Sequence, residues 1–419
     1  MVIIKFMDNK ILNNYLHKIE SYLDEDEAIN ILKSIIQIDS RTNSKNENNI
    51  IEYWESKFSE LGTINKLHKT KDNRLNLISN LNFSDNHKTI IFNGHLDTNH
   101  IGYGWTVDPF GGEIINNHIH GLGVSNMKAS MAAMYYSAKI LKQIGLVKGK
   151  IVFTSVLGEL QGGIGTQTLL DNGLEGDFFI NGEPTDLNYM TIHSGTYSFV
   201  INIIGETRHL SKREEATDAT IIMNKILNEI SVLDISKKII DNEEKKLNII
   251  HIGSVRSGLG EQFSDDRPPQ VSDNAIIHGS VRFTNFDDIK ITNNEIENIT
   301  SKYKKLYPKS NIIFNIQSNN PIMPPIKTNL TQNTIDLINK SNILIKNSNA
   351  IIGQILPYSL YGTDAGHIVN KLKIPGFVMG SGGKYNTQPD ERVSLKDYID
   401  NIKLYCLLSI GLLEQNNIH

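Results

Sequence analysis

The sequence predicts an α/β domain interrupted by a second, α+β domain. Apolar runs with strand spacing and helical spacing alternate before residue 195 and again after residue 318. Between them the order changes to strand, helix, two strands, helix and strand. A chain of 419 residues also exceeds one ordinary core. We therefore expect a discontinuous α/β domain (residues 1–194 and 318–419) around an inserted βαββαβ domain (residues 195–317).

The first α/β segment begins with helices and then alternates. Two sets of apolar residues at helical spacing predict two helices within residues 10–62. Strands are expected after them at 76–79, 88–93, 150–157 and 177–181, with helices at 127–144 and 165–173. This alternation is typical of a mixed, mostly parallel sheet flanked by helices.

The inserted domain is expected to contain a different order of elements. Its strands are predicted at 196–204, 247–255, 275–283 and 311–316, with helices at 213–230 and 288–307. Residues 319–325 resemble a linker, and alternation then resumes with a helix at 331–341, a strand at 373–379 and a helix at 396–414.

Composition excludes several classes of protein. A net charge of −4 gives no electrostatic reason to expect nucleic acid or an anionic membrane as a partner. The single cysteine, Cys406, excludes an internal disulfide framework and any multi-cysteine zinc site. No apolar stretch reaches membrane-spanning length, and residues 1–7 are too short an apolar run for a signal peptide. We therefore expect a cytoplasmic protein.

The segment Asn93–Thr98 carries the strongest chemical signal. His95 and Asp97 follow an apolar run at the end of a predicted strand, where residues two apart point to the same side. An imidazole and a carboxylate that converge in this way are typical of metal-dependent hydrolases, although an ordinary polar strand end has the same pattern.

Four further loops carry polar residues that are expected to converge with this segment. They cover residues 121–128, 158–165, 181–185 and 380–391. In open α/β sheets, ligands bind at the carboxyl ends of the strands, where such loops lie.

Together with Trp105–Gly112, Gly205–His209 and Gly362–Ala365, these loops resemble the M20 family of metallopeptidases and deacylases. That family includes acetylornithine deacetylase, succinyl-diaminopimelate desuccinylase, aminoacylase and carboxypeptidase G. The resemblance implies the predicted two-domain fold and a homodimer formed through the inserted domain, which acts as a lid. It also implies a small N-acyl amino acid or peptide-like substrate and a pair of zinc ions.

The resemblance assigns a role to five residues. His95 and Glu183 match the ligands of the first zinc ion, and Asp97 matches the residue that orients the histidine. Glu159 matches the general base. His209 matches a lid histidine that stabilises the developing oxyanion.

Three positions depart from the family pattern. Asn126 stands where the bridging Asp belongs, and a neutral amide bridges two cations poorly. Leu160 replaces the Glu that binds the second metal, and Thr387 replaces the late His that binds it. All three changes affect the second zinc or the bridge, so we expect no cofactor or a single zinc ion.

Further residues are expected to bind the substrate. The resemblance assigns the substrate carboxylate to Arg282, whose guanidinium suits bidentate recognition. The other candidates are Asn126, Thr363, Tyr385, Asn386 and Thr387.

These observations favour a divergent enzyme of the M20 fold that has lost its dinuclear zinc centre. In this interpretation Glu159 performs acid/base chemistry, including a non-hydrolytic acyl transfer, cyclisation or elimination. One alternative is a deacylase that uses a single metal at His95 and Glu183. A second alternative is a non-catalytic protein that binds an amino-acid derivative.

Overall fold

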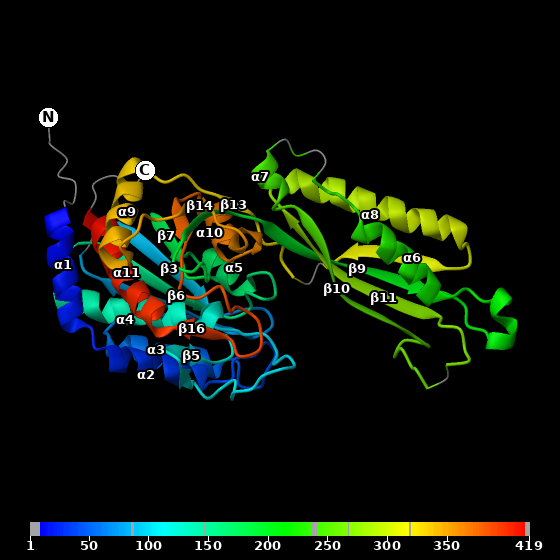
Figure 1. Ribbon diagram of the computed structural model, residues 1–419, viewed down its shortest axis with the longest axis horizontal. Helices are drawn as coiled ribbons and strands as arrows, with labels where there is room; N and C mark the ends of the chain where they lie inside the picture. The colour runs from blue at the N-terminus through cyan, green and yellow to red at the C-terminus, as the bar shows by residue number, and fades with distance from the viewer. Residues whose placement is uncertain are drawn as a thin grey trace. The chain divides into compact units, whose positions relative to one another are not determined.

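The computed structural model describes residues 9–84, 88–145, 148–236, 239, 241–266, 268–317 and 320–414 (Figure 1). They divide into two compact units. Unit 1 contains the described residues up to Ile192, Ile326–Ser359 and those from Thr363 onward, and unit 2 contains His193–Pro325 and Leu360–Gly362. The residues considered for a signal peptide (1–7) and the expected boundary at residue 318 lie outside the described part of the chain.

Unit 1 is built on a mixed sheet with the strand order β1-β2-β6-β3-β7-β15-β8-β13. The central pairs β6–β3, β3–β7 and β7–β15 are parallel, whereas β1–β2 and β2–β6 are antiparallel. This largely parallel centre, flanked by helices, confirms the predicted fold class. The strands are β1 (Ile64–Lys69), β2 (Leu75–Asn82), β3 (Thr89–His95), β6 (Lys150–Val156), β7 (Phe178–Asn181), β8 (Tyr189–His193), β13 (Ile326–Lys327), β14 (Ile352–Gln354) and β15 (Gly376–Val378).

Apolar helix faces pack on this sheet and form its core. The long helices α4 and α11 contact each other, and Phe92 of β3 packs against Tyr405 of α11 with ring centroids 5.0 Å apart. The helices of unit 1 are α1 (Asn9–Tyr22), α2 (Glu25–Ile36), α3 (Asn49–Glu60), α4 (Ala129–Ile144), α5 (Ile164–Asp171), α9 (Gln332–Lys346), α10 (Ala365–Leu372) and α11 (Leu395–Glu414).

The amino-terminal region differs from the prediction of two helices. Residues 9–62, all of them described, contain three helices, because α1 precedes α2 and α3. Helix α1 is rich in polar residues and buries only Leu12 and Ile19, so its apolar periodicity is weak. Strand β1 was also not predicted, and its burial pattern is mostly exposed because it lies at the sheet edge.

A small three-stranded sheet joins two distant loops of unit 1. Its order is β16-β5-β4, with β4 at Ile114–Ile115, β5 at His118–His120 and β16 at Arg392–Ser394. Strand β16 directly follows the loop 380–391, and η1 (Val124–Lys128) directly follows the segment after β5. The sheet therefore brings the loop at 380–391 next to the loop at 121–128.

Unit 2 is a four-stranded antiparallel sheet with the order β10-β11-β9-β12. In β9 and β11 buried residues alternate with half-buried ones, as expected for a sheet with one face on a core. Helix α6 begins at Ala219 rather than at 213, because Asp218 accepts a hydrogen bond from Ile221 N and caps it. The elements are β9 (Gly195–Ile204), η2 (Leu210–Glu215), α6 (Ala219–Ser231), α7 (Asn242–Lys245), β10 (Ile249–Gly258), β11 (Asn274–Phe283), α8 (Phe286–Leu306) and β12 (Asn311–Ile316).

None of the helices in the described ranges has the length and hydropathy of a membrane span.

The buried His193 makes stability depend on pH. Burial lowers the pKa of His193 from 6.5 to about 4. Below pH 6.5 the unfolded chain therefore binds a proton that the folded chain does not bind, so stability falls as pH falls from 6.5 toward 4. At pH 5 the loss is about 2 kcal/mol, at roughly 1.4 kcal/mol for each pH unit. Denaturant unfolding at pH 7 and pH 5 measures it, and His193→Gln removes this contribution. An equal loss in the variant would contradict the assignment.

Candidate active site

The carboxyl ends of three neighbouring strands meet at one edge of the unit 1 sheet. Strand β3 lies between β6 and β7 and runs parallel to both. Parallel strands place the loops that follow them at the same edge. His95 ends β3 and Asp97 follows it, while the loops after β6 and β7 carry Glu159 and Glu183. The side chains of all four residues are buried.

The two ring nitrogens of His95 have different partners. Nδ1 lies 2.9 Å from the backbone oxygen of Asp97, which only accepts, so Nδ1 carries a hydrogen and donates it. Nε2 lies 2.7 Å from Asn126 Oδ1 and 3.3 Å from Glu183 Oε1. Burial acts to lower the pKa of His95, but Glu183 and Asp97 outweigh it and raise that pKa well above its usual value.

The Asp97 carboxylate holds the turn after β6. It accepts hydrogen bonds from the backbone N–H groups of Glu159, at 3.3 Å, and Leu160, at 3.2 Å. Its Oδ1 lies 3.5 Å from His95 Nδ1. Burial opposes ionisation of Asp97, but His95 and the two N–H groups outweigh it and lower its pKa. Asp97 therefore contacts the imidazole mainly through its backbone and positions Glu159 through its side chain.

His95, Glu159 and Glu183 form a compact group of potential ligands. One donor atom from each lies within 4.8 Å of the donors of the other two. Burial is the largest cause that raises the pKa of Glu159 well above its usual value; the positive charge of His95 opposes this shift, and the charge of Glu183 adds to it. The group therefore offers one imidazole nitrogen and two carboxylates in a buried space, a donor set that suits a divalent cation.

The backbone of Asn126 is held in place by a buried carboxylate that was not assigned a role from sequence. Glu391 accepts hydrogen bonds from the N–H groups of Gly123 (3.2 Å), Ser125 (2.8 Å) and Asn126 (3.1 Å). Burial raises the pKa of Glu391 to about 7, and the three N–H groups oppose this rise. The only sequence signal for this role was an acidic residue that ends a glycine-rich loop directly before a strand.

A second buried carboxylate, Asp364, lies at the start of α10. Among the described residues, the Thr166 side chain interacts with this carboxylate, but neither Asp364 oxygen makes a hydrogen bond of ordinary geometry. Burial raises the pKa of Asp364 to about 7, and the charge of His95 opposes this rise. Asp364 also adds to the upward shift in the pKa of Glu159, so the two carboxylates interact. Sequence reasoning used Gly362–Ala365 only as part of the family resemblance.

The structure places the two other substituted positions differently from Asn126. Leu160 is half-buried, and its backbone N–H donates to Asp97. Thr387 is exposed, and its hydroxyl donates to Asn386 Oδ1 at 2.8 Å. Neither side chain belongs to the group formed by His95, Glu159 and Glu183.

The remaining candidates of unit 1 have local partners. The guanidinium of Arg392 lies over the Tyr385 ring, 3.6 Å from its centroid. The role of Tyr385 in substrate binding stays a prediction. Thr363 is fully buried, and its hydroxyl accepts a hydrogen bond from Ala365 N at 3.2 Å. Asn386 donates its backbone N–H to Gly383 O.

His209 and Arg282 belong to unit 2. His209 is exposed, precedes η2 and accepts a hydrogen bond at Nδ1 from Ser211 N, 3.2 Å away. Arg282 lies in β11. Burial is the largest cause that lowers the pKa of His193, the Ser194 backbone opposes this shift, and the charge of Arg282 adds to it. Their roles in the reaction stay predictions.

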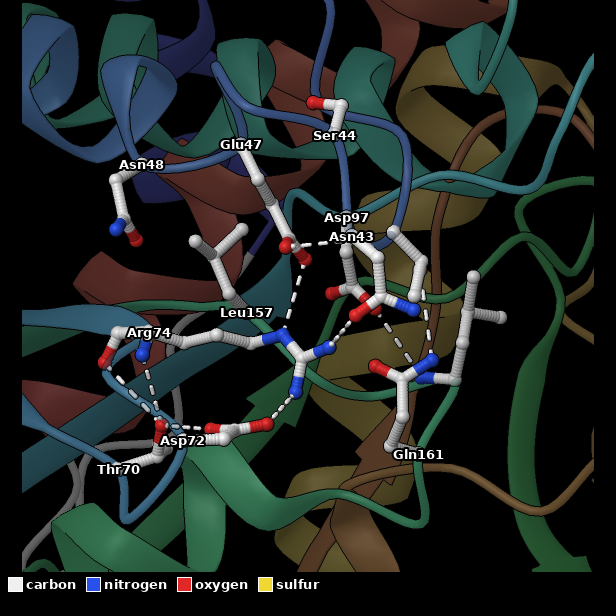
Figure 2. A network of polar contacts seen from close by, with 12 residues as sticks. Asn43, Ser44, Glu47, Asn48, Thr70, Asp72, Arg74, Asp97, Leu157 and Gln161 are labelled. Atoms are coloured by element: carbon white, nitrogen blue, oxygen red, sulfur yellow. Dashed lines mark hydrogen bonds and ion pairs between the residues drawn. The ribbon is translucent and has the colours of Figure 1, made fainter.

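A buried ion-pair network supports the segment beside Asp97 (Figure 2). The Arg74 guanidinium lies between Glu47, 3.1 Å away, Asn43, 2.9 Å away, and Asp72. The adjoining residue Thr42 donates its N–H to Thr98 O at 2.9 Å. Burial raises the pKa of Glu47; Arg74 opposes this rise, and Asp97 adds to it. Arg74 therefore anchors the chain that runs alongside the His95 loop.

Comparisons with known proteins place the chain in a family context. A family model described as peptidase family M20/M25/M40 matches residues 91–410. The chain is 28% identical over 226 residues to acetylornithine deacetylase of Buchnera aphidicola subsp. Schizaphis graminum, a match that covers 52% of this chain and 58% of that protein. It is 29% identical over 213 residues to a probable succinyl-diaminopimelate desuccinylase of Staphylococcus epidermidis, covering 50% and 52%. The chain thus spans about half the length of the curated relatives it matches.

Solved structures match nearly the whole chain. The dipeptidase Dug1p from Saccharomyces cerevisiae gives a TM-score of 0.78 at 12% identity, covering 97% of this chain and 99% of that chain. An M20 family metallo-carboxypeptidase from Sulfolobus solfataricus gives 0.72 at 18% identity, covering 93% and 99%. The YxeP protein of Bacillus subtilis, a dinuclear metal-binding peptidase of the M20 family, gives 0.63 at 14% identity, covering 94% and 99%. At these identities the likeness shows the fold.

Removal of Arg74 is expected to destabilise the protein. Arg74→Met leaves the Glu47 carboxylate buried without its cation, which costs about 3–5 kcal/mol in the free energy of unfolding. The double variant Arg74→Met/Glu47→Leu removes both charges and is expected to regain most of that loss. Chemical denaturation measures both variants, with Lys71→Met, an exposed neighbour, as the control. A double variant as unstable as the single one would show that the ion pair is not the cause.

Proposed function

Because the chain belongs to peptidase family M20/M25/M40, we propose that it is an amidohydrolase that acts on a small N-acyl amino acid or a short peptide-like substrate. The observation that carries this proposal is the convergence of His95, Glu159 and Glu183 in one buried group. The curated relatives named above support it, since their names describe deacylation.

The residues around His95 fit one divalent cation. The Nδ1 hydrogen is engaged by the Asp97 backbone, so a neutral imidazole presents its lone pair at Nε2. Glu183 Oε1 lies 3.3 Å from Nε2, and Asn126 Oδ1 lies 2.7 Å from it. These three donors match the three protein ligands of a usual catalytic zinc site. We propose these residues as the ligands.

A second cation does not fit. Leu160 has no donor atom in its side chain, and the Thr387 hydroxyl is exposed and bonded to Asn386. Asn126 offers one neutral oxygen, which already lies 2.7 Å from His95 Nε2. We therefore propose that the dinuclear centre typical of the family is reduced here to a single ion at most.

Glu159 is proposed as the general base and acid. A bound cation would lower the pKa of a water molecule and polarise the acyl carbonyl. Glu159 removes a proton from the attacking water, whose oxygen bonds to the acyl carbon. It then delivers that proton to the leaving nitrogen as the C–N bond breaks, which yields a carboxylic acid and an amine. The Asp97 carboxylate fixes the backbone of Glu159 during these transfers.

A second candidate reaction uses Glu159 without a cation. The short contact between His95 Nε2 and Asn126 Oδ1 favours it, because a protonated imidazole donates a hydrogen bond to that oxygen and pairs with Glu183. Such a site lacks a cation that lowers the pKa of water and polarises the carbonyl, so acyl transfer, cyclisation or elimination suits it better than hydrolysis of an ordinary amide.

The role of Glu159 is tested by Glu159→Gln. We expect kcat on N-acyl amino acids to fall by about 10²-fold or more, because the amide cannot accept the proton. Binding of the same ligands, measured by calorimetry, is expected to persist. Glu175→Gln, an exposed change in unit 1, serves as the control. Loss of binding without a specific loss of kcat would assign Glu159 to ligand binding, and an unchanged kcat would exclude it as the base.

Metal content tests the proposed ligands. Protein purified without chelator is expected to hold about one equivalent of zinc per chain, and Glu183→Gln is expected to lose it. Elemental analysis measures both, and turnover of the wild-type chain is expected to stop after chelation. Two equivalents would disprove the loss of the second site. Turnover that persists in a metal-free, chelated chain would favour the second candidate reaction.

A further inference from the structure

A cavity adjoins the candidate active site within unit 1. Its volume is about 100 Å³, which is room for several water-sized groups. Asn126 connects the two, because its side chain lines the cavity and its Oδ1 lies 2.7 Å from His95 Nε2. Asn99, His100, Trp105 and Gln388 also line it. A substrate whose scissile bond lies near His95 therefore has space for one short substituent here.

Among the described residues, the lining of this cavity contains no Lys or Arg side chain that could pair with a ligand carboxylate. Its own carboxylate is that of Glu391. That carboxylate already accepts hydrogen bonds from the N–H groups of Gly123, Ser125 and Asn126. A ligand carboxylate would therefore find no Lys or Arg partner here to offset its loss of hydration, and His100 is the one basic side chain among the described lining residues.

The same lining is rich in neutral hydrogen-bonding groups. Asn126 uses its Oδ1 and its backbone N–H, but its Nδ2 has no hydrogen-bond partner among the described residues. The side-chain amides of Asn99 and Gln388 add further donors and acceptors. A carbonyl oxygen is the acceptor that complements two free amide hydrogens.

We propose that this cavity is the acyl subsite and that it selects a short, uncharged acyl group, such as acetyl or carbamoyl, over one that ends in a carboxylate, such as succinyl. Asn126 Nδ2 donates to the acyl oxygen, while Asn126 Oδ1 faces His95. This inference rests on the proposed function, because it assigns the acyl half of the same substrate.

Binding measurements test this selectivity apart from turnover. The full-length Glu159→Gln chain is titrated by calorimetry with the N-acetyl and N-succinyl forms of ornithine, glutamate and leucine. We expect each N-acetyl form that binds to do so at least tenfold more tightly than its N-succinyl form. Equal or tighter binding of the N-succinyl forms, or no binding of either form, would overturn the acyl subsite.

A charge introduced into the lining tests the physical cause. Gln388→Arg, added to Glu159→Gln, is expected to tighten binding of the N-succinyl forms at least tenfold and to leave the N-acetyl forms no tighter. Ile115→Arg places the same charge at an exposed position outside the lining and serves as the control. An unchanged preference in Gln388→Arg would overturn the proposal.

Turnover by the wild-type chain separates this inference from the proposed function. If the N-acetyl forms bind preferentially but none is hydrolysed, the amidohydrolase proposal fails and the acyl subsite stands. If the N-succinyl forms are hydrolysed as efficiently as the N-acetyl forms, the amidohydrolase proposal stands and the acyl subsite is wrong.

Discussion

The hydrogen bond from His95 Nδ1 to the backbone oxygen of Asp97 determines which ring nitrogen takes part in chemistry. A backbone carbonyl only accepts, so Nδ1 keeps its hydrogen whatever else binds in the site. The imidazole can then change only at Nε2, which either carries a hydrogen or presents a lone pair. Nε2 faces Asn126 and Glu183. Under the proposed function, a cation and a proton would compete for the same lone pair, and the outcome of this competition would separate the two proposed reactions.

Buried negative charge is the second constraint on the site. Asp97, Glu159, Glu183 and Asp364 are all buried near one imidazole, and buried carboxylates need a compensating charge or a proton. Asp97 is compensated by hydrogen bonds, whereas the raised pKa values of Glu159 and Asp364 show that compensation for them is incomplete. The neighbouring cavity contains much less charge than the site around His95, because most of its lining residues are neutral.

The parts of this site that follow from local sequence were predictable. His95, Asp97, Glu159 and Glu183 lie at the carboxyl ends of adjacent parallel strands, and apolar strand runs mark such ends. The fold class followed from the same alternation of strands and helices. Helix α1 and strand β1 escaped prediction because they bury few residues, so their periodicity is weak.

Contacts between distant segments were only partly predictable. The family resemblance placed Asn126 close to His95, 31 positions away, but nothing in the sequence indicated that Glu391 reaches the backbone of Asn126 across 265 positions. No residue pattern encodes this second contact, since it depends on how the loops fold onto the sheet edge.

The way Glu391 holds the Asn126 loop has a consequence for how this scaffold changes over evolutionary time. Its carboxylate accepts hydrogen bonds from three backbone N–H groups and interacts with the charge of Lys128, and none of these contacts involves the side chain at position 126. An exchange between carboxylate and amide at this position therefore alters the chemistry of the site without rebuilding its frame. A substitution at position 126 can therefore change the reaction, while Glu391 continues to hold the backbone of the loop in the same conformation.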